Sequence, residues 1–309
     1  MSQQANPALR KRKLKRAVFI ISFLFVPTVN FLVFYVYVNF NSFLMAFQKQ
    51  VGGETVWSLE TIQQVFQRFF PIDDEMKMIF RNTFLTFGIG LCMFVVGFFV
   101  SYFLYKKILF YKGFRVLFYL PSILPGVVLC TIYQEMVGIN SPLPDFVQRL
   151  FSLDYRPELL ADSRFANFFV LLNMVWLSFP GNLILWGGTF SRIPDSVVEA
   201  ARLDGVNFVQ EAFRIIIPCV WPTFSLLLTL QLAGIFGSSG QVFLLTKGDY
   251  GTQTFSSWMY IQVYSVTLDP RSNTFNFMSA LGMFITLIAA VLSLSLRKFA
   301  SKVFQSVEY

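Results

Sequence analysis

Residues 199–218 read EAARLDGVNFVQEAFRIIIP, a polar, helix-forming stretch that separates two long apolar runs of the chain. Pro194 suits the first turn of a helix that leads into it. Gly205 can adopt the left-handed backbone that ends this helix and turns the chain. Asn207, followed three residues later by Gln210, is the pattern of a capping box for a second helix. The stretch therefore predicts two helices joined by a sharp turn.

The composition places this stretch in a membrane protein. Hydrophobic residues make up 55% of the 309 residues, charged residues only 14%, and the mean hydropathy is +0.58. Soluble domains carry about a quarter charged residues, and a helix needs about 20 apolar residues to cross the hydrocarbon core. The sequence therefore predicts an all-α membrane protein with six transmembrane helices. They are expected at about 17–39, 79–104, 115–137, 165–190, 217–237 and 275–296.

Charge placement predicts the orientation of these spans. An N-terminus on the inside puts residues 1–16, 105–115, 191–214 and 297–309 in the cytoplasm, so that the polar loop 191–217 and the tail 298–309 face that side. The inner segments then hold 16 of the 25 Lys and Arg residues and only 5 of the 17 Asp and Glu residues. Both termini are therefore predicted to be cytoplasmic, in a multi-pass plasma-membrane protein.

The segments at either end of the first span carry their own expectations. The basic run Arg10–Arg16 directly precedes the span, which favours contact with anionic lipid over nucleic acid. The span is longer than the core of about 7–15 residues of a signal peptide, so we expect it to remain uncleaved. The outer segment 40–78 is expected to carry an amphipathic helix that starts near Ser58.

The sequence lacks the residues that several kinds of function require. The chain has no histidine, and its three cysteines have no paired spacing, so no metal site, catalytic residue or cofactor is expected. No P-loop motif occurs, so the chain cannot supply ATP hydrolysis itself. The interiors of the spans lack Asp, Glu, Lys and Arg, which argues against a proton-driven carrier. An ion-coupled secondary transporter of a small polar solute stays open as the alternative, because carbonyls and hydroxyls can hold sodium. A non-transporting scaffold is a third possibility.

The spacing in the polar loop is specific. It runs E-A-A, three residues, Gly, nine residues, and then I-x-I-P. This pattern resembles the cytoplasmic EAA loop of ATP-binding-cassette importer permeases, with Ile217 in a position where the family has Leu. Composition alone favours an ordinary amphipathic connection between spans. The residues that match the pattern are Glu199, Ala200, Ala201, Gly205, Ile215 and Pro218.

Further motifs resemble the carbohydrate-importer, MalF-like branch of this family. Thr246–Tyr250 departs from the T-x-G-G-P of that branch, so a sugar, an oligosaccharide or a glycerol-phosphate-like solute all remain open. The motifs are Arg81-Asn82-Thr83, Arg115 through Leu120-Pro121, Pro125, Ile139-Asn140-Ser141 and Leu244-Leu245-Thr246.

The resemblance implies an ABC type I importer permease fold at about 80–297 and a specific assembly. The expected partners are a second homologous permease subunit, two ATP-binding cassette ATPase subunits and an extracellular solute-binding lipoprotein. It implies that Glu199 and the following helix dock in a groove of the ATPase, and that Gly205 keeps the turn sharp. The chain itself would form the translocation path for a sugar or oligosaccharide.

A path for a hydroxylated solute needs hydrogen-bonding groups and flat apolar faces inside the bundle. The same residue types also serve as hydrogen bonds between helices or, for tryptophan, as interface anchors. The candidates are Tyr133, Gln134, Asn173, Trp176, Asn182 and Gln231.

Overall fold

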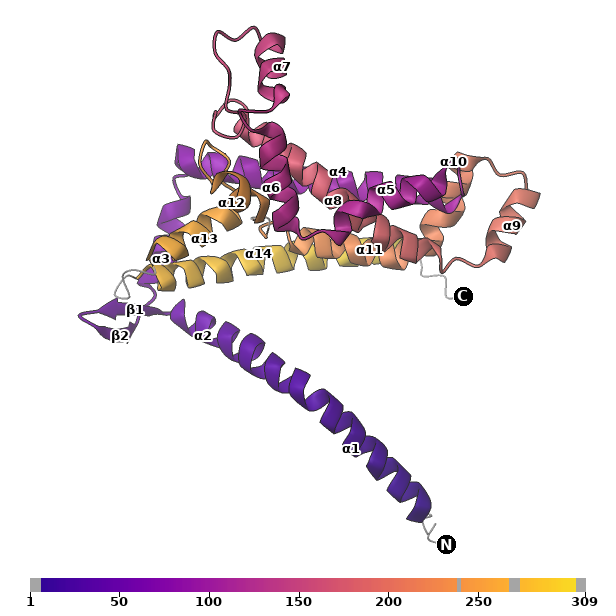
Figure 1. The fold of residues 1–309 in the computed structure, drawn as a ribbon. Helices are drawn as coiled ribbons and strands as arrows, with labels where there is room; N and C mark the ends of the chain where they lie inside the picture. Colours follow the sequence, from indigo (N-terminus) through magenta and orange to yellow (C-terminus); the bar gives the residue numbers. More distant parts are fainter. Residues whose placement is uncertain (1–6, 238–239, 267–272, 304–309) are drawn as a thin grey trace. The chain divides into compact units, whose positions relative to one another are not determined.

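The computed structural model describes residues 7–237, 240–266 and 273–303 (Figure 1). The chain divides into two compact units, residues 1–68 with 266–284 and residues 69–265 with 285–309. In the described residues the regular structure is helical apart from one two-stranded hairpin. The all-α membrane class is therefore confirmed, with the hairpin as an addition.

The first unit begins with a long apolar helix. Its segments are α1 (Pro7–Asn30), the π-helical η1 (Phe31–Tyr37) and α2 (Val38–Met45). The helix continues to Met45, past the predicted end at residue 39. The polar residues at that end do not interrupt it, because Asn39, Asn41 and Ser42 each donate a hydrogen bond to the carbonyl four residues earlier, at 2.6, 3.1 and 3.0 Å.

A β-hairpin follows, made of β1 (Gln48–Val51) and β2 (Glu54–Trp57) in antiparallel register. Gly52 and Gly53 form its turn with φ of +61° and +92°, a backbone that glycine adopts at low cost. We did not predict this hairpin, although Gly-Gly between two short strands is its usual signal.

Two asparagines at the start of the last helix hold the hairpin within the same unit. Asn273 accepts a hydrogen bond from the amide of Gln50 at 2.7 Å, and Asn276 donates to the carbonyl of Gln48 at 2.9 Å. Helix α3 (Glu60–Phe69) lies in the segment where the amphipathic helix is predicted, and the Ser58 hydroxyl accepts from the first amide of that helix.

The second unit contains the main helix bundle. Helix α4 packs along α8, and α5 packs against α8 as well (Figure 1). Helices α10, η2 and α11 form one continuous helix over residues 208–233. The elements are α4 (Asp74–Tyr105), α5 (Tyr111–Ile123), α6 (Gly126–Val137), α7 (Pro142–Leu150), α8 (Ala166–Phe190), α9 (Asp195–Leu203), α10 (Phe208–Glu211), η2 (Ala212–Ile216), α11 (Ile217–Ala233), α12 (Gly240–Thr246), α13 (Phe255–Val266) and α14 (Thr274–Val303), of which α14 contributes to both units.

The described residues contain five helices that are long and apolar enough to cross a membrane. The pair α5 and α6, bent by 102° at the break between them, makes a sixth span if the two helices are counted as one broken span. Leu124 is extended at the bend, with ψ of 143°, as expected for a residue before proline. The third predicted span is therefore interrupted at Leu124–Pro125.

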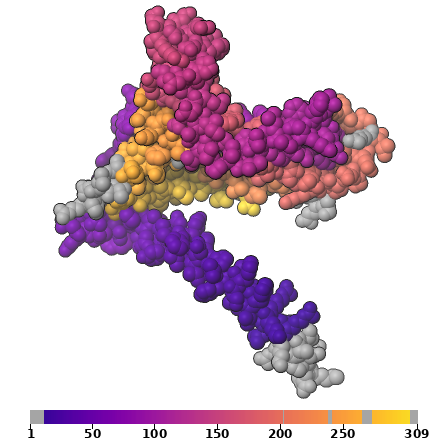
Figure 2. Space-filling view, viewed as in Figure 1, coloured from indigo at the N-terminus to yellow at the C-terminus, as the bar shows by residue number. Residues whose placement is uncertain are grey.

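The outward-predicted segments of the second unit also contain helices. Helix α7 and the loop after it project from the rest of this unit (Figure 2), and the buried Val147 of α7 belongs to one apolar cluster with Tyr133 and Val137 of α6. The predicted outer loop 238–273 contains α12 and α13, which we did not predict, while residues 238–239 and 267–272 lie outside the described part of the chain. Figure 1 shows α6 and α7 at one end of α8, and α9 and α10 near the other.

Candidate coupling loop and solute cavity

The polar loop forms the predicted helix–turn–helix. Helix α9 ends at Leu203, and Gly205 takes φ of +68°. The Val206 amide then donates to the carbonyl of Ala201 at 3.3 Å, which closes the helix end. A Cβ on Gly205 would meet no atom within 4 Å, so the backbone angle, and not lack of space, requires glycine here.

The second helix starts with the predicted capping box. The Asn207 side chain accepts from the Gln210 amide at 2.9 Å, and the Gln210 side chain accepts from the Asn207 amide at 3.2 Å. The helix does not end at Pro218 but continues as α11 into the bundle. Ile215 and Pro218 are half-buried and lie where the π-helical turn η2 passes into α11. Proline has no amide hydrogen to donate, and the irregular hydrogen bonding of a π-helical turn tolerates its absence.

Helix α9 has one face in the core and one face open. Val198 and Ala201 are buried, with 7% and 4% of their surface exposed. Glu199 and Ala200 are exposed. Leu203 is 89% exposed, which is unusual for a leucine and was not among the predicted site residues. The open face of α9 thus combines a carboxylate, a small residue and an exposed leucine.

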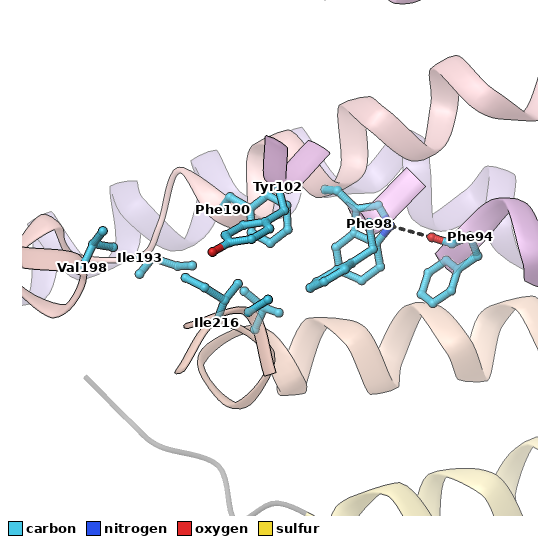
Figure 3. Packing of buried hydrophobic residues seen from close by; sticks show 10 residues of the cluster. Phe94, Phe98, Tyr102, Phe190, Ile193, Val198 and Ile216 are labelled. Carbon is cyan, nitrogen blue, oxygen red and sulfur yellow. Dashed lines mark hydrogen bonds between the residues drawn. The ribbon is translucent and has the colours of Figure 1, made fainter. Parts of the chain in front are cut away.

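The buried face belongs to an aromatic cluster that reaches into the bundle (Figure 3). Trp186 is fully buried, lies edge-on to Phe98 at 5.1 Å, and donates from its indole nitrogen to the carbonyl of Phe94 at 3.2 Å. The polar loop is therefore packed directly onto α4 and α8. The buried members of the cluster are Phe94, Phe98, Tyr102, Trp186, Phe190, Ile193, Val198, Ala212, Ile216 and Val220.

A buried ion pair adds a polar contact beside this cluster. The Lys106 ammonium lies 2.7 Å from both carboxylate oxygens of Glu211. Only 15% of the lysine side chain and 5% of the glutamate side chain are exposed. Sequence reasoning missed this pair, because the two residues lie far apart in the chain and neither belongs to a motif.

A polar cavity of about 220 Å³ lies between α4, α8, α11 and α12. Gln231, one of the predicted path residues, lines it. Gly90 leaves room for that side chain, since a Cβ there would lie 2.6 Å from the Gln231 amide nitrogen. Gln241 at the start of α12 was missed, because the segment was expected to be a loop. The lining residues are Thr86, Phe87, Ile89, Gly90, Met174, Ser178, Leu230, Gln231, Gly234 and Gln241.

Three other predicted path residues gather where α6 meets α8. The Tyr133 hydroxyl donates to the carbonyl of Phe169 at 2.7 Å, and its ring lies 6.2 Å from that of Trp176. Asn173 is fully buried, and its side-chain oxygen lies 3.8 Å from the sulfur of Cys130. These contacts join two helices.

The remaining two candidates also lie at contacts between elements. Gln134 donates to the carbonyl of Leu244 in α12 at 3.0 Å. Asn182 lies against Gly97, where an added Cβ would come within 2.7 Å of the asparagine Cβ. Of the six predicted path residues, the structure therefore places only Gln231 on the polar cavity.

Two residues of the Arg81-Asn82-Thr83 motif join α4 to the segment that leads into α13. Asn82 donates to the carbonyls of Gly251 and Gln253 at 2.7 and 3.0 Å, and the Thr83 hydroxyl accepts from the amide of Phe255 at 2.8 Å. Both side chains are buried and hold the loop before α13 against α4. In the described residues, no group of three or more His, Cys, Asp or Glu side chains is placed to hold a metal ion.

The model of the family described as "Binding-protein-dependent transport system inner membrane component" matches residues 93–305. The chain belongs to this family. Its match includes the whole polar loop and the cavity-lining parts of α8, α11 and α12. The chain is therefore a transport component of the inner-membrane type.

Relatives of this permease carry sugar-transport names. The chain is 23% identical over 282 residues to the multiple sugar-binding transport system permease protein MsmF of Streptococcus mutans, covering 91% of this chain and 94% of MsmF. It is 27% identical over 212 residues to the maltose/maltodextrin transport system permease protein MalF of Vibrio vulnificus, covering 67% of this chain and 39% of MalF.

A solved structure confirms the fold of the permease. A chain in the crystal structure of a bacterial ABC transporter involved in the import of the acidic polysaccharide alginate matches with a TM-score of 0.74 and 19% identity. The match covers 95% of this chain and 99% of that chain. The ABC type I importer permease fold, predicted from the polar loop, is therefore confirmed.

Proposed function

We propose that this chain is the permease subunit of an ATP-driven importer and forms half of the path for a sugar or oligosaccharide. Membership in the binding-protein-dependent family and the sugar-transport names of MsmF and MalF support this assignment. The observation that carries it is the open face of α9, which presents Glu199, Ala200 and Leu203 from a loop packed onto the core.

In this proposal the open face docks on a separate ATPase subunit. Glu199 and Ala200 contact the ATPase, Ala201 holds α9 against the bundle, and Gly205 provides the turn that positions the helix. Ile215 and Pro218 lie at the junction through which the loop continues into α11. The loop faces the cytoplasm, with both chain termini on the same side, as the basic residues predict.

The polar cavity is the proposed solute contact of this subunit. Its amides and hydroxyls from Gln231, Gln241 and Thr86 suit sugar hydroxyls, and Phe87 offers a flat apolar face. At about 220 Å³ the cavity is smaller than usual small-molecule sites of about 300–1,000 Å³. A second, homologous permease subunit would complete the path.

The assembly would also contain two ATP-binding cassette subunits and an extracellular solute-binding lipoprotein that delivers the solute. Binding of ATP would close the ATPase pair and move the coupling loop 191–217, and hydrolysis would return it. The binding protein supplies part of the selectivity, so the identity of the transported sugar depends on that partner.

Mild-detergent purification of the tagged chain tests the proposal. We expect an ATP-binding subunit, a second permease and a solute-binding protein to co-purify, with ATPase activity stimulated by the loaded binding protein. Solute uptake by the chain alone in liposomes, driven by an ion gradient, would favour the ion-coupled alternative instead. An assembly with no ligand-stimulated ATPase would favour a scaffold.

A further inference from the structure

We propose that Lys106, Glu211 and Phe208 form a rigid joint through which movement of the coupling loop reaches α4. This inference rests on the proposed function, since it assumes that a partner ATPase moves the loop. The three residues would act as positioning residues: they contact neither solute nor nucleotide, and they hold the second helix of the loop to the end of a bundle helix.

The ionic part of the joint lies between two helix ends of opposite polarity. Lys106 follows the last residue of α4, where the carbonyls of the final turn carry partial negative charge. Glu211 lies in the first helical turn after the Asn207 cap, where the free amides carry partial positive charge. Each charge is therefore stabilised by its own helix end as well as by its partner at 2.7 Å.

The aromatic part lies beside the ion pair. The ring of Phe208 stacks on that of Phe103 at 5.0 Å and 17°, and lies 4.8 Å from the ring of Tyr102. One turn further along, Phe213 lies 6.1 Å from Phe99. Two helices that share an ion pair and three ring contacts over successive turns cannot slide past each other without breaking several contacts.

The joint differs from the contact of α9 with the bundle. Helix α9 is held by apolar contacts of Val198 and Ala201, which have no preferred direction and allow small shifts. The Lys106–Glu211 pair is directional and buried, so separating it would leave two uncompensated charges in an apolar environment. A pull on α9 would therefore move α10 and α4 together, while α9 can adjust to its partner.

The experiment measures solute transported per ATP hydrolysed by the whole assembly in liposomes. We expect Glu211→Gln and Lys106→Met to lower this ratio at least about fivefold, the lower end of usual coupling between sites. The ratio is measured on the assembled complex, so a lower assembly yield does not change it. The exchanged pair Lys106→Glu with Glu211→Lys should recover part of the ratio. The matched control is Lys107→Met, which changes the exposed neighbouring lysine and should leave the ratio unchanged.

If both single variants keep the wild-type ratio of solute transported to ATP hydrolysed, the proposed joint is wrong. A loss that the exchanged pair does not recover, while that pair assembles normally, would overturn it as well. Failure of the wild-type assembly to transport would instead reject the proposed function. The two failures are therefore distinguishable in one set of preparations.

A second measurement does not depend on the ion pair. Phe103→Cys with Phe208→Cys allows a short thiol-specific cross-linker to lock the two helices together. We expect the locked assembly to keep transporting, because a rigid joint does not open during the cycle. Loss of transport on cross-linking, restored on cleavage of the linker, would show that the helices must separate and would overturn the proposal.

Discussion

The coupling end of the second unit and its solute cavity are built in opposite ways. At the coupling end, fully buried aromatic rings, an ion pair and a capping box hold the loop to α4 and α8. At the cavity, two glutamines and two glycines surround about 220 Å³ of space, and no ion pair is described there. One region is packed to move as a body, whereas the other leaves side chains room to rearrange.

This difference matches the two tasks of a driven transporter. A contact that transmits force must not deform, so tight aromatic packing and paired charges suit it. A site that binds and releases a solute must change its hydrogen bonds in each cycle, so amides with free volume suit it. Substitutions should therefore affect coupling at one end and apparent affinity at the other.

The largest effect is expected on the open face of the coupling loop. Glu199→Lys reverses one of the two exposed carboxylates of α9, the other being Asp195 one turn earlier, and Gly205→Pro cannot adopt the observed φ of +68°. Both variants should abolish uptake and ATPase co-purification while membrane insertion survives. Ser196→Ala, on the same exposed helix, is the control and should retain both activities. Normal transport by Glu199→Lys and Gly205→Pro would remove the docking claim.

A loss of stability is expected next, at the aromatic cluster. Trp186→Ala deletes a fully buried ring and its hydrogen bond, which should lower the free energy of unfolding by about 3–5 kcal/mol. Thermal unfolding of the purified chain in detergent measures this. Trp57→Ala, at a tryptophan that is 65% exposed, should change stability by less than about 0.5 kcal/mol. Equal shifts for both variants would contradict a rigid coupling end.

A change of affinity is expected at the cavity. Gly90→Ala would place a Cβ 2.6 Å from the Gln231 amide nitrogen and displace that side chain. We expect the KM for uptake to rise by up to about tenfold, with assembly and basal ATPase unchanged. Gly88→Ala is the matched control, because a Cβ there meets no atom within 4 Å. An unchanged KM for Gly90→Ala would remove Gln231 from the solute path.

The smallest effect is expected at the helix cap. Asn207→Ala removes the side-chain acceptor for the Gln210 amide, which should cost about 1 kcal/mol of stability. Asn207→Gly should cost only a few tenths of a kcal/mol, since glycine is tolerated at this position. Thermal unfolding compares the two variants. A larger loss with glycine than with alanine would show that the cap acts through something other than this hydrogen bond.

The sequence predicted the features that depend on local patterns. Apolar length predicted the spans, and Gly205 with Asn207 predicted the turn and cap of the coupling loop. Each of these depends on residues within a few positions of one another, so spacing alone is informative. The same holds for the family, because its motif is a local spacing.

The features that depend on packing between distant segments could not be predicted. Glu211 reads as an ordinary loop residue until the fold places it against Lys106. Amides in spans look alike in sequence, yet Asn173 is enclosed where α6 meets α8, whereas Gln231 faces a cavity. Helix α12 was missed because its short apolar run, bounded by glycine and lysine, is too short to stand out.

The central claim is that the exposed face of α9 contacts an ATP-binding partner on the cytoplasmic side. A photo-reactive amino acid in place of Ala200 tests it directly in inside-out membrane vesicles that contain the whole assembly. The account predicts one major adduct between this chain and an ATP-binding subunit, whose yield changes on addition of ATP. An adduct with lipid alone, or labelling of this position only by reagents applied from the extracellular side, would contradict it.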